Sequence, residues 1–419
     1  MKDSAPADDA PPLPPDGDLR FEPTRAAGLD RLRDFVPRAG RDYAANRNHD
    51  LPGHPHVSSL SPYVRHRAVT EAEVAAAVLD RFAPSTAQKF LQEVVWRTYW
   101  KGWLERRPAV WDWYLRDLDA ARNRLATESG LRRGWEAACR GETGIAPFDA
   151  WARELARTGY MHNHARMWFA SIWVHTLHLP WELGADFFLR HLLDGDPASN
   201  TLSWRWVAGL HTRGKTYVAR ASNIGKYTGG RFDTSELGHR LTPGRDVAAL
   251  EGPPAPDPAE VPDDADLTPG LRTGLLLHDE DMHPAYLFKR GLRPVAGAML
   301  IQPRGRSPFE VSARVVDFTL ALAEDAVARH GGDMDVAAPT QSIADIRAWA
   351  GRAALQQIVT PYAPVGPTRT ALDALAAQLD IPLVRPIRAW DQAAWPHCTA
   401  GFFKLKKRMP DILETVIQD

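Results

Sequence analysis

The sequence predicts a multi-domain chain of class α and α/β, with an all-helical part followed by a parallel α/β part. Helical periodicity dominates from Phe21 to about Leu241, and few alternating β-branched runs interrupt it. A segment rich in Pro and Asp then follows at 242–268 and is predicted to be a linker. Beyond it, short apolar runs alternate with helical patterns, which is typical of a doubly wound parallel sheet.

Individual elements follow from local signals. Residues 1–20 are rich in Pro and Asp and are predicted to be a disordered tail. Thr70 and Glu73 have the spacing of a capping box, so a helix is expected to begin there. In the second part, buried strands are predicted at 273–277, 296–301, 335–338 and 381–386.

Composition excludes several kinds of protein. The chain has 419 residues, enough for two or three domains, and a formal charge of −1, so any contact with nucleic acid must come from a local basic patch. Its two cysteines, Cys139 and Cys398, argue against a disulfide framework and exclude a four-cysteine iron–sulfur cluster within one chain. We expect a cytoplasmic protein without a membrane segment, because no run reaches about 18 apolar residues.

The stretch from Thr158 to Asp233 combines tryptophans with charged and amide side chains. If residues 159–175 form a helix, Asn163, Arg166 and Met167 share one face. Such a face suits a flat heteroaromatic ligand that carries phosphates. It equally describes a solvent-exposed helix with ion pairs, and the spacing alone slightly favours that alternative.

The order of the motifs favours the ligand. NHARM, WELG, DGDPASN, WRW, YVARASN and KYTGGRFD follow one another, after VSSLSPY and FLQEVVWRTYW. Over residues 43–233 this series resembles the flavin-binding half of the photolyase/cryptochrome family. The resemblance implies that residues 21–241 form a helical FAD-binding domain.

A second resemblance covers the remainder of the chain. LLLHDEDMHPAYL and TAGFFKLKKRMPDIL are similar to segments of the family's Rossmann-like α/β antenna domain, here expected at 269–419. The usual domain order is reversed, which indicates a circular permutation with 242–268 as the joint. The residues indicate neither whether this domain binds an antenna chromophore nor which one. The cluster from His278 to His283 could take a metal, but adjacent side chains on an extended strand point apart, so we expect a family loop and no metal.

The flavin resemblance implies roles for individual residues. Arg166 and Asp194 would pair beside the isoalloxazine ring, Asp196 would reach the pyrimidine edge or the ribose, and Asn200 would face flavin N5. Ser58, Ser59 and Ser61 would grip the diphosphate, although capping of a helix near Ser61 is an equal alternative. The other residues implied at the cofactor are Tyr43, Arg97 and Asn163.

The resemblance also implies a site for light-driven repair of cyclobutane pyrimidine dimers. Trp96 and Trp206 would wall the dimer, Glu93 would hydrogen-bond it, and Met167 would pack on it. Core packing for the tryptophans and a solvated helix face for Glu93 are the alternatives. Electron transfer would use Trp204 and Trp181, and Trp113, Trp135 and Trp151 are candidates for a third member.

The expected partner is UV-damaged DNA. His164 stands where the family has an arginine, so Arg220, with Arg65 or Arg67, would have to replace that phosphate contact. We expect either modest DNA affinity or a preference for single strands. The alternative functions are a cryptochrome-type blue-light receptor, a non-catalytic flavin-binding relic, and a lyase for (6-4) lesions that uses His162 and His164. The residues do not indicate an oligomeric state.

Overall fold

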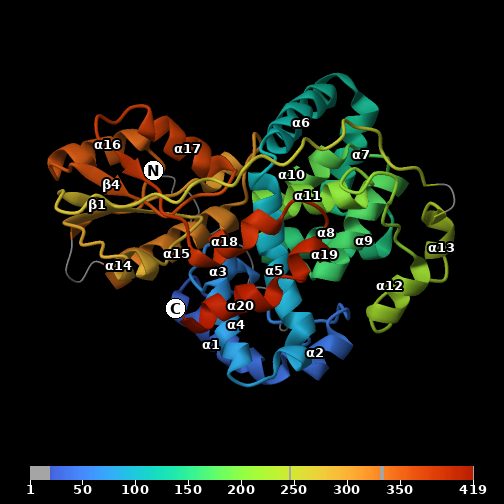
Figure 1. The fold of residues 1–419 in the computed structure, drawn as a ribbon. Coiled ribbons are helices and arrows are strands. Elements are labelled where there is room, and N and C mark those ends of the chain that lie inside the picture. The colour runs from blue at the N-terminus through green and yellow to red at the C-terminus, as the bar shows by residue number, and fades with distance from the viewer. Residues whose placement is uncertain (1–18, 245–246, 331–334, 419) are drawn as a thin grey trace, which may run out of the picture.

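The computed structural model describes residues 19–244, 247–330 and 335–418, and the predicted tail lies outside these ranges except for Leu19 and Arg20. Helices fill the first part of the chain, as predicted (Figure 1). They are α1 (Arg25–Phe35), α2 (Arg41–Asn46), α3 (Ser61–Arg65), α4 (Glu71–Leu79), α5 (Pro84–Glu105), α6 (Ala109–Thr127), α7 (Ser129–Arg140), α8 (Ala146–Thr158), α9 (Asn163–Ser171), α10 (Trp181–His191), α11 (Pro197–Val207), α12 (Ala221–Tyr227) and α13 (Leu237–Arg240). Residues 36–38 form a 3-10 turn and 172–176 a π-helical turn.

Helix α5 runs through the middle of the molecule (Figure 1). It is 22 residues long, and Pro84 occupies its first turn, where its missing N–H costs nothing. Its buried residues Val95, Tyr99 and Trp103 join the large core of the helical part. The predicted capping box at the start of α4 is confirmed, because Thr70 Oγ1 accepts from the Glu73 amide and Glu73 accepts from the Thr70 amide at 2.9 Å.

Five parallel strands form the sheet, in the order β3-β2-β1-β4-β5. They are β1 (Thr273–His278), β2 (Ala296–Leu300), β3 (Asp335–Val336), β4 (Gln357–Val359) and β5 (Leu383–Val384). In register, Leu275 of β1 lies opposite Gly297 of β2 and Val359 of β4. The predicted α/β class and all four predicted strands are confirmed. Strand β4 was not predicted, although its three residues make it longer than β3 and β5, which have two residues each.

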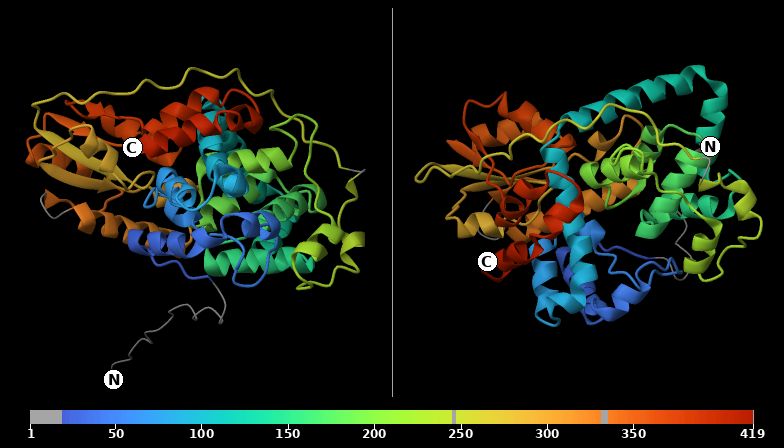
Figure 2. Two further views of the ribbon diagram at one scale, coloured as in Figure 1. Left: turned by 60° about the horizontal axis from the view of Figure 1, so that its bottom comes forward. Right: turned by 45° about the vertical axis from the view of Figure 1, so that its right-hand side comes forward.

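The two faces of the sheet pack against different layers. Helices α16 (Ile343–Arg352) and α17 (Pro367–Ala376) cover one face, and α14 (Ala285–Lys289) and α15 (Ala313–His330) cover the other (Figures 1 and 2). Leu276 belongs to the core under α16 and α17. Leu275 and Leu277 point the opposite way and belong to the core that continues into the helical part.

Residues 247–268 carry no helix or strand and run along the surface between the two parts (Figure 2). Asp264 accepts from the Ile387 amide at 2.8 Å and pairs with Arg290, and the Ala259 amide donates to the Arg106 carbonyl at 2.8 Å. The segment is therefore attached to both parts. No helix among the described residues is both long and apolar enough to cross a membrane.

After the sheet, the chain returns to the helical part. The helices α18 (Ala389–Ala394), α19 (Phe402–Lys406) and α20 (Met409–Gln418), with a 3-10 turn at 395–397, pack against α4 and α5 (Figure 1). Trp390 Nε1 donates to Thr98 Oγ1 of α5 at 2.8 Å. Gly102 lets α5 pack closely against the turn at 395–397, since a Cβ at this position would lie 2.5 Å from the Trp395 ring and 2.8 Å from Cys398 Sγ.

Buried ion pairs join the two parts at the carboxyl end of β1. Glu280 pairs with Arg65 of α3 at 2.7 Å and with Lys101 of α5 at 2.8 Å. Asp281 pairs with Arg388 at 2.6 Å. The acidic residues after β1 therefore act as a structural loop, and no described group of three or more His, Cys, Asp or Glu residues could hold a metal ion.

These ion pairs make the free energy of unfolding depend on pH in the acid range. Burial alone would raise the pKa of Glu280, but Arg65 and Lys101 lower it to about 2, below the value of about 4.3 expected in the unfolded chain. Glu280 therefore contributes stability that is present above about pH 4.3 and is lost as the pH falls toward 2.

We expect Glu280→Gln to remove this dependence. The difference in unfolding free energy between wild type and variant, measured by urea denaturation, should shrink by on the order of 3 kcal/mol between about pH 5 and pH 2. An unchanged difference over that range would contradict the assignment.

Candidate functional site

The Arg166–Asp194 pair that the sequence suggested is present. Arg166 Nη2 lies 2.8 Å from Asp194 Oδ2, and Arg166 Nε donates to the Met161 carbonyl at 2.9 Å. The helix expected over 159–175 begins later, at Asn163, because His162 caps it by accepting from the His164 amide. Asp194 lies in the turn between α10 and α11, and its Oδ1 is buried without a hydrogen-bond partner.

Asp196 stands two residues further along the same turn and caps α11. Its Oδ1 accepts from the Ser199 amide at 2.8 Å, and its Oδ2 lies 2.7 Å from Lys101 Nζ. Burial alone would raise the pKa of Asp196, but Lys101, with Arg97 and Arg65, holds this pKa well below its usual value. Both oxygens of this carboxylate, which was expected at a cofactor edge, are thus engaged within the protein.

Asn200 and Trp204 lie one turn apart on α11. The Asn200 amide nitrogen donates to the Ala185 carbonyl at 2.8 Å, which leaves its side-chain oxygen as the atom able to accept from a ligand. Trp204 is 2% exposed, and its Nε1 has no partner. Its ring packs on Gly184 of α10, where any side chain would collide with the indole.

The serine loop lies before α3. Ser59 has a φ of +50°, which is uncommon for a residue with a side chain, and its buried Oγ has no partner. Ser58 Oγ accepts from the Leu60 amide at 3.4 Å. Ser61 is the first helical residue, and Leu60 is the cap without a side-chain bond, so capping by Ser61 is not what this loop does.

Unpartnered buried atoms test whether a group such as FAD fits here. A buried polar atom without a partner costs about 1–3 kcal/mol, so such atoms are candidates to bind a ligand. Asp194 Oδ1 and Ser59 Oγ are such atoms, and they could accept from a ring N–H and donate to a phosphate, respectively. The oxygen of the Asn200 side chain, whose nitrogen donates to Ala185, could accept from a reduced ring nitrogen. The donor set therefore fits a flavin nucleotide.

Glu93 of α5 pairs with Arg47, whose Nη1 lies 2.7 Å from Glu93 Oε1. Burial raises the pKa of Glu93, and Arg47 only partly offsets this effect. Sequence reasoning missed Arg47, because an arginine 46 residues away carries no local signal of its partner. The solvated helix face considered for Glu93 is not observed, since the residue is half-buried.

Trp96 and Trp206 are both half-buried, and each is stacked by a ring of the chain itself. Phe402 of α19 lies parallel to Trp96, with ring centroids 3.8 Å apart and an interplanar angle of 10°. Tyr217 stacks on Trp206 at 5.5 Å. Phe402 is a residue of the site that sequence reasoning missed. It lies at the start of α19, within residues 269–419, which were expected to form the α/β domain.

The remaining predicted residues lie around these groups. Met167 is half-buried on α9, one residue after Arg166, whereas Asn163 at the start of α9 and Arg220 before α12 are exposed. His164 stacks on Trp168 at 4.1 Å, and burial lowers its pKa. Tyr43 packs on Phe90 at 5.1 Å, and Arg97 pairs with Glu71.

The two tryptophans expected to carry electrons have different neighbours. Trp204 contacts Trp173 at 6.1 Å and Phe188 at 5.1 Å, and Trp181 contacts Tyr114 at 5.7 Å. Of the candidates for a third member, Trp151 stacks on Trp168, and Trp135 makes a tilted ring contact with Phe309. Trp173, which sequence reasoning did not consider for this role, is the tryptophan in ring contact with Trp204.

Comparisons with known proteins point to the same region. Residues 90–235 match the family model for the FAD binding domain of DNA photolyase. The deoxyribodipyrimidine photo-lyase of Vibrio cholerae is 30% identical over 224 residues, which are 51% of this chain and 44% of that protein. The enzyme of that name from Agrobacterium fabrum is 31% identical over 258 residues, covering 61% of this chain and 52% of the relative.

Solved structures give a partial match. The structure of a bacterial class III photolyase from Agrobacterium tumefaciens is 30% identical and covers 49% of this chain and 43% of that one, with a TM-score of 0.41. This chain spans about half the length of the curated relatives that it matches.

Proposed function

We propose that this chain, whose residues 90–235 match the model for the FAD binding domain of DNA photolyase, repairs cyclobutane pyrimidine dimers in DNA under blue light. The observation that carries the proposal is the half-buried Glu93, whose pKa is raised by burial, one helical turn before Trp96 on α5. Its carboxyl group can hold a proton closer to neutral pH than a free glutamic acid.

The cofactor would be held by the Arg166–Asp194 pair, by the unpartnered Ser59 Oγ and by the Asn200 side chain. Arg166 and Asp194 would bind the flavin ring, Ser59 a phosphate, and the Asn200 oxygen a ring N–H. Reduced FAD supplies the electron for this chemistry when it is bound and excited. Asn200 would accept a hydrogen bond without adding a charge. Because an amide does not titrate, the side chain has no protonation that could be coupled to that of the ring.

The chain's own residues would bind and polarise the lesion. Glu93 Oε2 would donate its proton in a hydrogen bond to a pyrimidine carbonyl, and Arg47 holds the other oxygen in place. Trp206 and Met167 would contact the dimer through apolar surface. A damaged base pair is cheaper to open than an intact one, which favours entry of the dimer into such a site.

Repair can be measured directly. Purified protein with chemically reduced FAD is mixed with single- and double-stranded oligonucleotides that contain one thymine dimer, and is then illuminated with blue light. We expect thymine absorbance to recover only in the light. Glu93→Ala should abolish most of this recovery, whereas Glu93→Gln, which can still donate a hydrogen bond, should retain more. Absence of repair by protein with bound, photoreducible FAD would refute the proposal.

A second candidate function is a cryptochrome-type blue-light receptor that signals through a partner. One observation favours it: Phe402 occupies a face of Trp96, one of the rings expected to wall the lesion. A receptor does not take a lesion between these rings, so the stack of Phe402 on Trp96 would not have to open. Bound, photoreducible FAD without repair of either DNA form would support this candidate.

A further inference from the structure

Five rings form a cluster on α5 and its neighbours, which we call the aromatic cluster: Trp96, Tyr99, Trp100, His211 and Phe402. Tyr99 lies at its centre, because its hydroxyl donates to the Ala400 carbonyl at 2.9 Å and lies 3.3 Å from His211 Nε2. His211 also contacts Trp100, with ring centroids 4.9 Å apart. The cluster thus brings together the loop after α11 and the segment that contains α19.

Both segments carry exposed positive charges beside the cluster. We call Arg213, Lys215, Lys404, Lys407 and Arg408 the basic rim, and all five are exposed. Within the described part of the chain, the first four have no ion-pair partner, and only Arg408 is paired, with Asp411 at 3.2 Å. An exposed pair of this kind is weak, so Arg408 can exchange Asp411 for a phosphate. The rim is a local concentration of charge on a chain whose formal net charge is −1.

A flat apolar ring stands among these charges. Phe403 is 74% exposed, and Lys406 Nζ lies 5.8 Å from its centroid. Its neighbour Phe402 is buried against Trp96, so the two phenylalanines of α19 have opposite environments. An exposed aromatic ring beside several lysines combines the stacking surface and the charge that unpaired nucleotides require.

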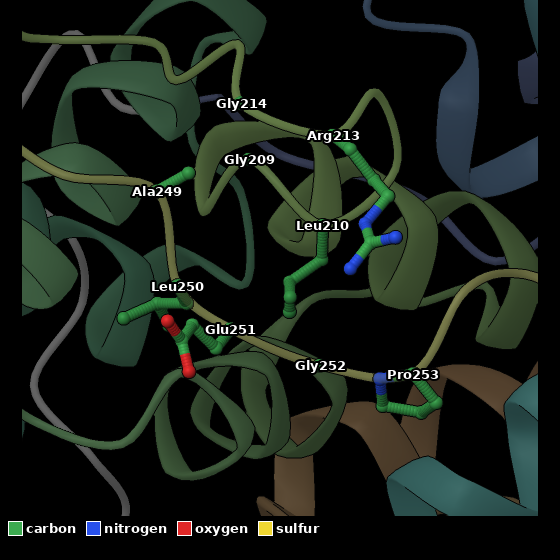
Figure 3. A pocket seen from close by; sticks show the side chains of 9 residues that line it. All are labelled: Gly209, Leu210, Arg213, Gly214, Ala249, Leu250, Glu251, Gly252 and Pro253. Atoms are coloured by element: carbon green, nitrogen blue, oxygen red, sulfur yellow. The ribbon is translucent and has the colours of Figure 1, made fainter.

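The loop after α11 presents its charge outward. A pocket of about 170 Å³ lies between residues 209–214 and residues 249–253, and its lining includes Arg213 and Glu251 (Figure 3). The side chains of Arg213 and Glu251 lie on different sides of Leu210 in this view. Arg213 is therefore not neutralised by the one acidic residue of the pocket.

From these observations we propose that the basic rim and Phe403 form a binding surface for single-stranded DNA. The rim would contact phosphates, and Phe403 would stack on an unpaired base. The aromatic cluster fixes the relative position of the two rim segments, so that one strand meets both. The choice of DNA as the partner rests on the proposed function, whereas the surface itself follows from its charge and its exposed ring.

The test measures binding in the dark by the full-length chain loaded with FAD. A fluorescein-labelled, undamaged oligothymidylate is titrated at several NaCl concentrations and followed by fluorescence anisotropy. The triple variant Lys404→Ser/Lys407→Ser/Arg408→Ser should bind about 10- to 100-fold more weakly at 0.1 M salt. Its slope of log K against log salt should fall by about 2, since each phosphate contact on a single strand contributes about 0.7.

Phe403→Ser separates stacking from charge. It should weaken binding about tenfold with the salt slope unchanged, because a stacked base contributes no counterion release. The matched control Arg116→Ser/Arg132→Ser/Arg133→Ser removes three exposed charges from α6 and α7, which lie apart from α19 (Figure 1), and should leave the slope unchanged. The proposal would be overturned if the rim triple variant had the same salt slope as wild type. It would also be overturned if the rim variant and the control lost the same amount of affinity.

This readout is independent of repair. A fall in the salt slope without any repair of a thymine dimer would leave the binding surface standing and refute the lyase. Unchanged repair by a rim variant whose salt slope is also unchanged would support the lyase and refute the binding surface. A double-stranded oligonucleotide that binds as tightly as the single strand would contradict the preference for unpaired DNA.

Discussion

Replacing Lys101 with methionine is expected to lower the free energy of unfolding by about 3–5 kcal/mol. Lys101 is 2% exposed and lies 2.7 Å from Asp196 and 2.8 Å from Glu280. Methionine keeps the apolar stem but leaves two buried carboxylates close together without their shared cation. Breaking a buried ion pair from one side has this cost, because the remaining charge stays desolvated.

Urea denaturation of Lys101→Met and of the exposed Lys215→Met would measure the effect, and the control should stay within about 0.5 kcal/mol of wild type. A loss below about 1 kcal/mol for Lys101→Met would mean that Arg65 and Arg97 compensate for the missing charge. Their guanidinium groups lie 2.7 Å from Glu280 and 4.0 Å from Asp196, respectively.

The second large effect is expected from Phe402→Leu. Leucine retains apolar burial beside α5 but removes the ring that stacks on Trp96. If Trp96 then accepts a base on the uncovered face, DNA that contains a thymine dimer should bind about tenfold more tightly, in line with about 1–3 kcal/mol per stacked base. Fluorescence anisotropy with damaged and undamaged oligonucleotides would measure the change.

The gain should depend on Trp96. The double variant Trp96→Leu/Phe402→Leu is therefore expected to bind no more tightly than Trp96→Leu alone. Equal tightening in both backgrounds would show that Phe402 affects binding by another route. Weaker binding by Phe402→Leu, with unfolding free energy near that of wild type, would identify Phe402 as part of the binding surface rather than a cover.

Local signals in the sequence predicted much of this architecture. The helical first part, the capping box at Thr70 and the four predicted strands depend on neighbouring residues, and the structure confirms them. The motif order identified the FAD-binding region, since residues 90–235 match that family model. Arg166 and Asp194 were suggested by their positions in those motifs, and they are paired.

What escaped prediction depends on partners far away in the chain. Nothing near Glu93 indicates Arg47, and nothing near Asp196 indicates that Lys101 and Glu280 complete its surroundings. Periodicity shows that a helix has an apolar face but not which element covers it. The roles of the individual residues toward FAD and DNA, the domain boundaries and the circular permutation stay predictions.

The return of the last helices to α5 has a consequence for how the protein is made. Tyr99 and Ala400 are hydrogen-bonded across 301 positions of sequence, and Phe402 meets Trp96 over a similar span. A ribosome therefore adds about 300 residues after α5 before α5 receives these neighbours. Contacts so distant in sequence form slowly and late. Until then Trp96 has no Phe402 beside it, so a nascent or truncated chain that ends before α18 would expose an apolar surface that chaperones bind.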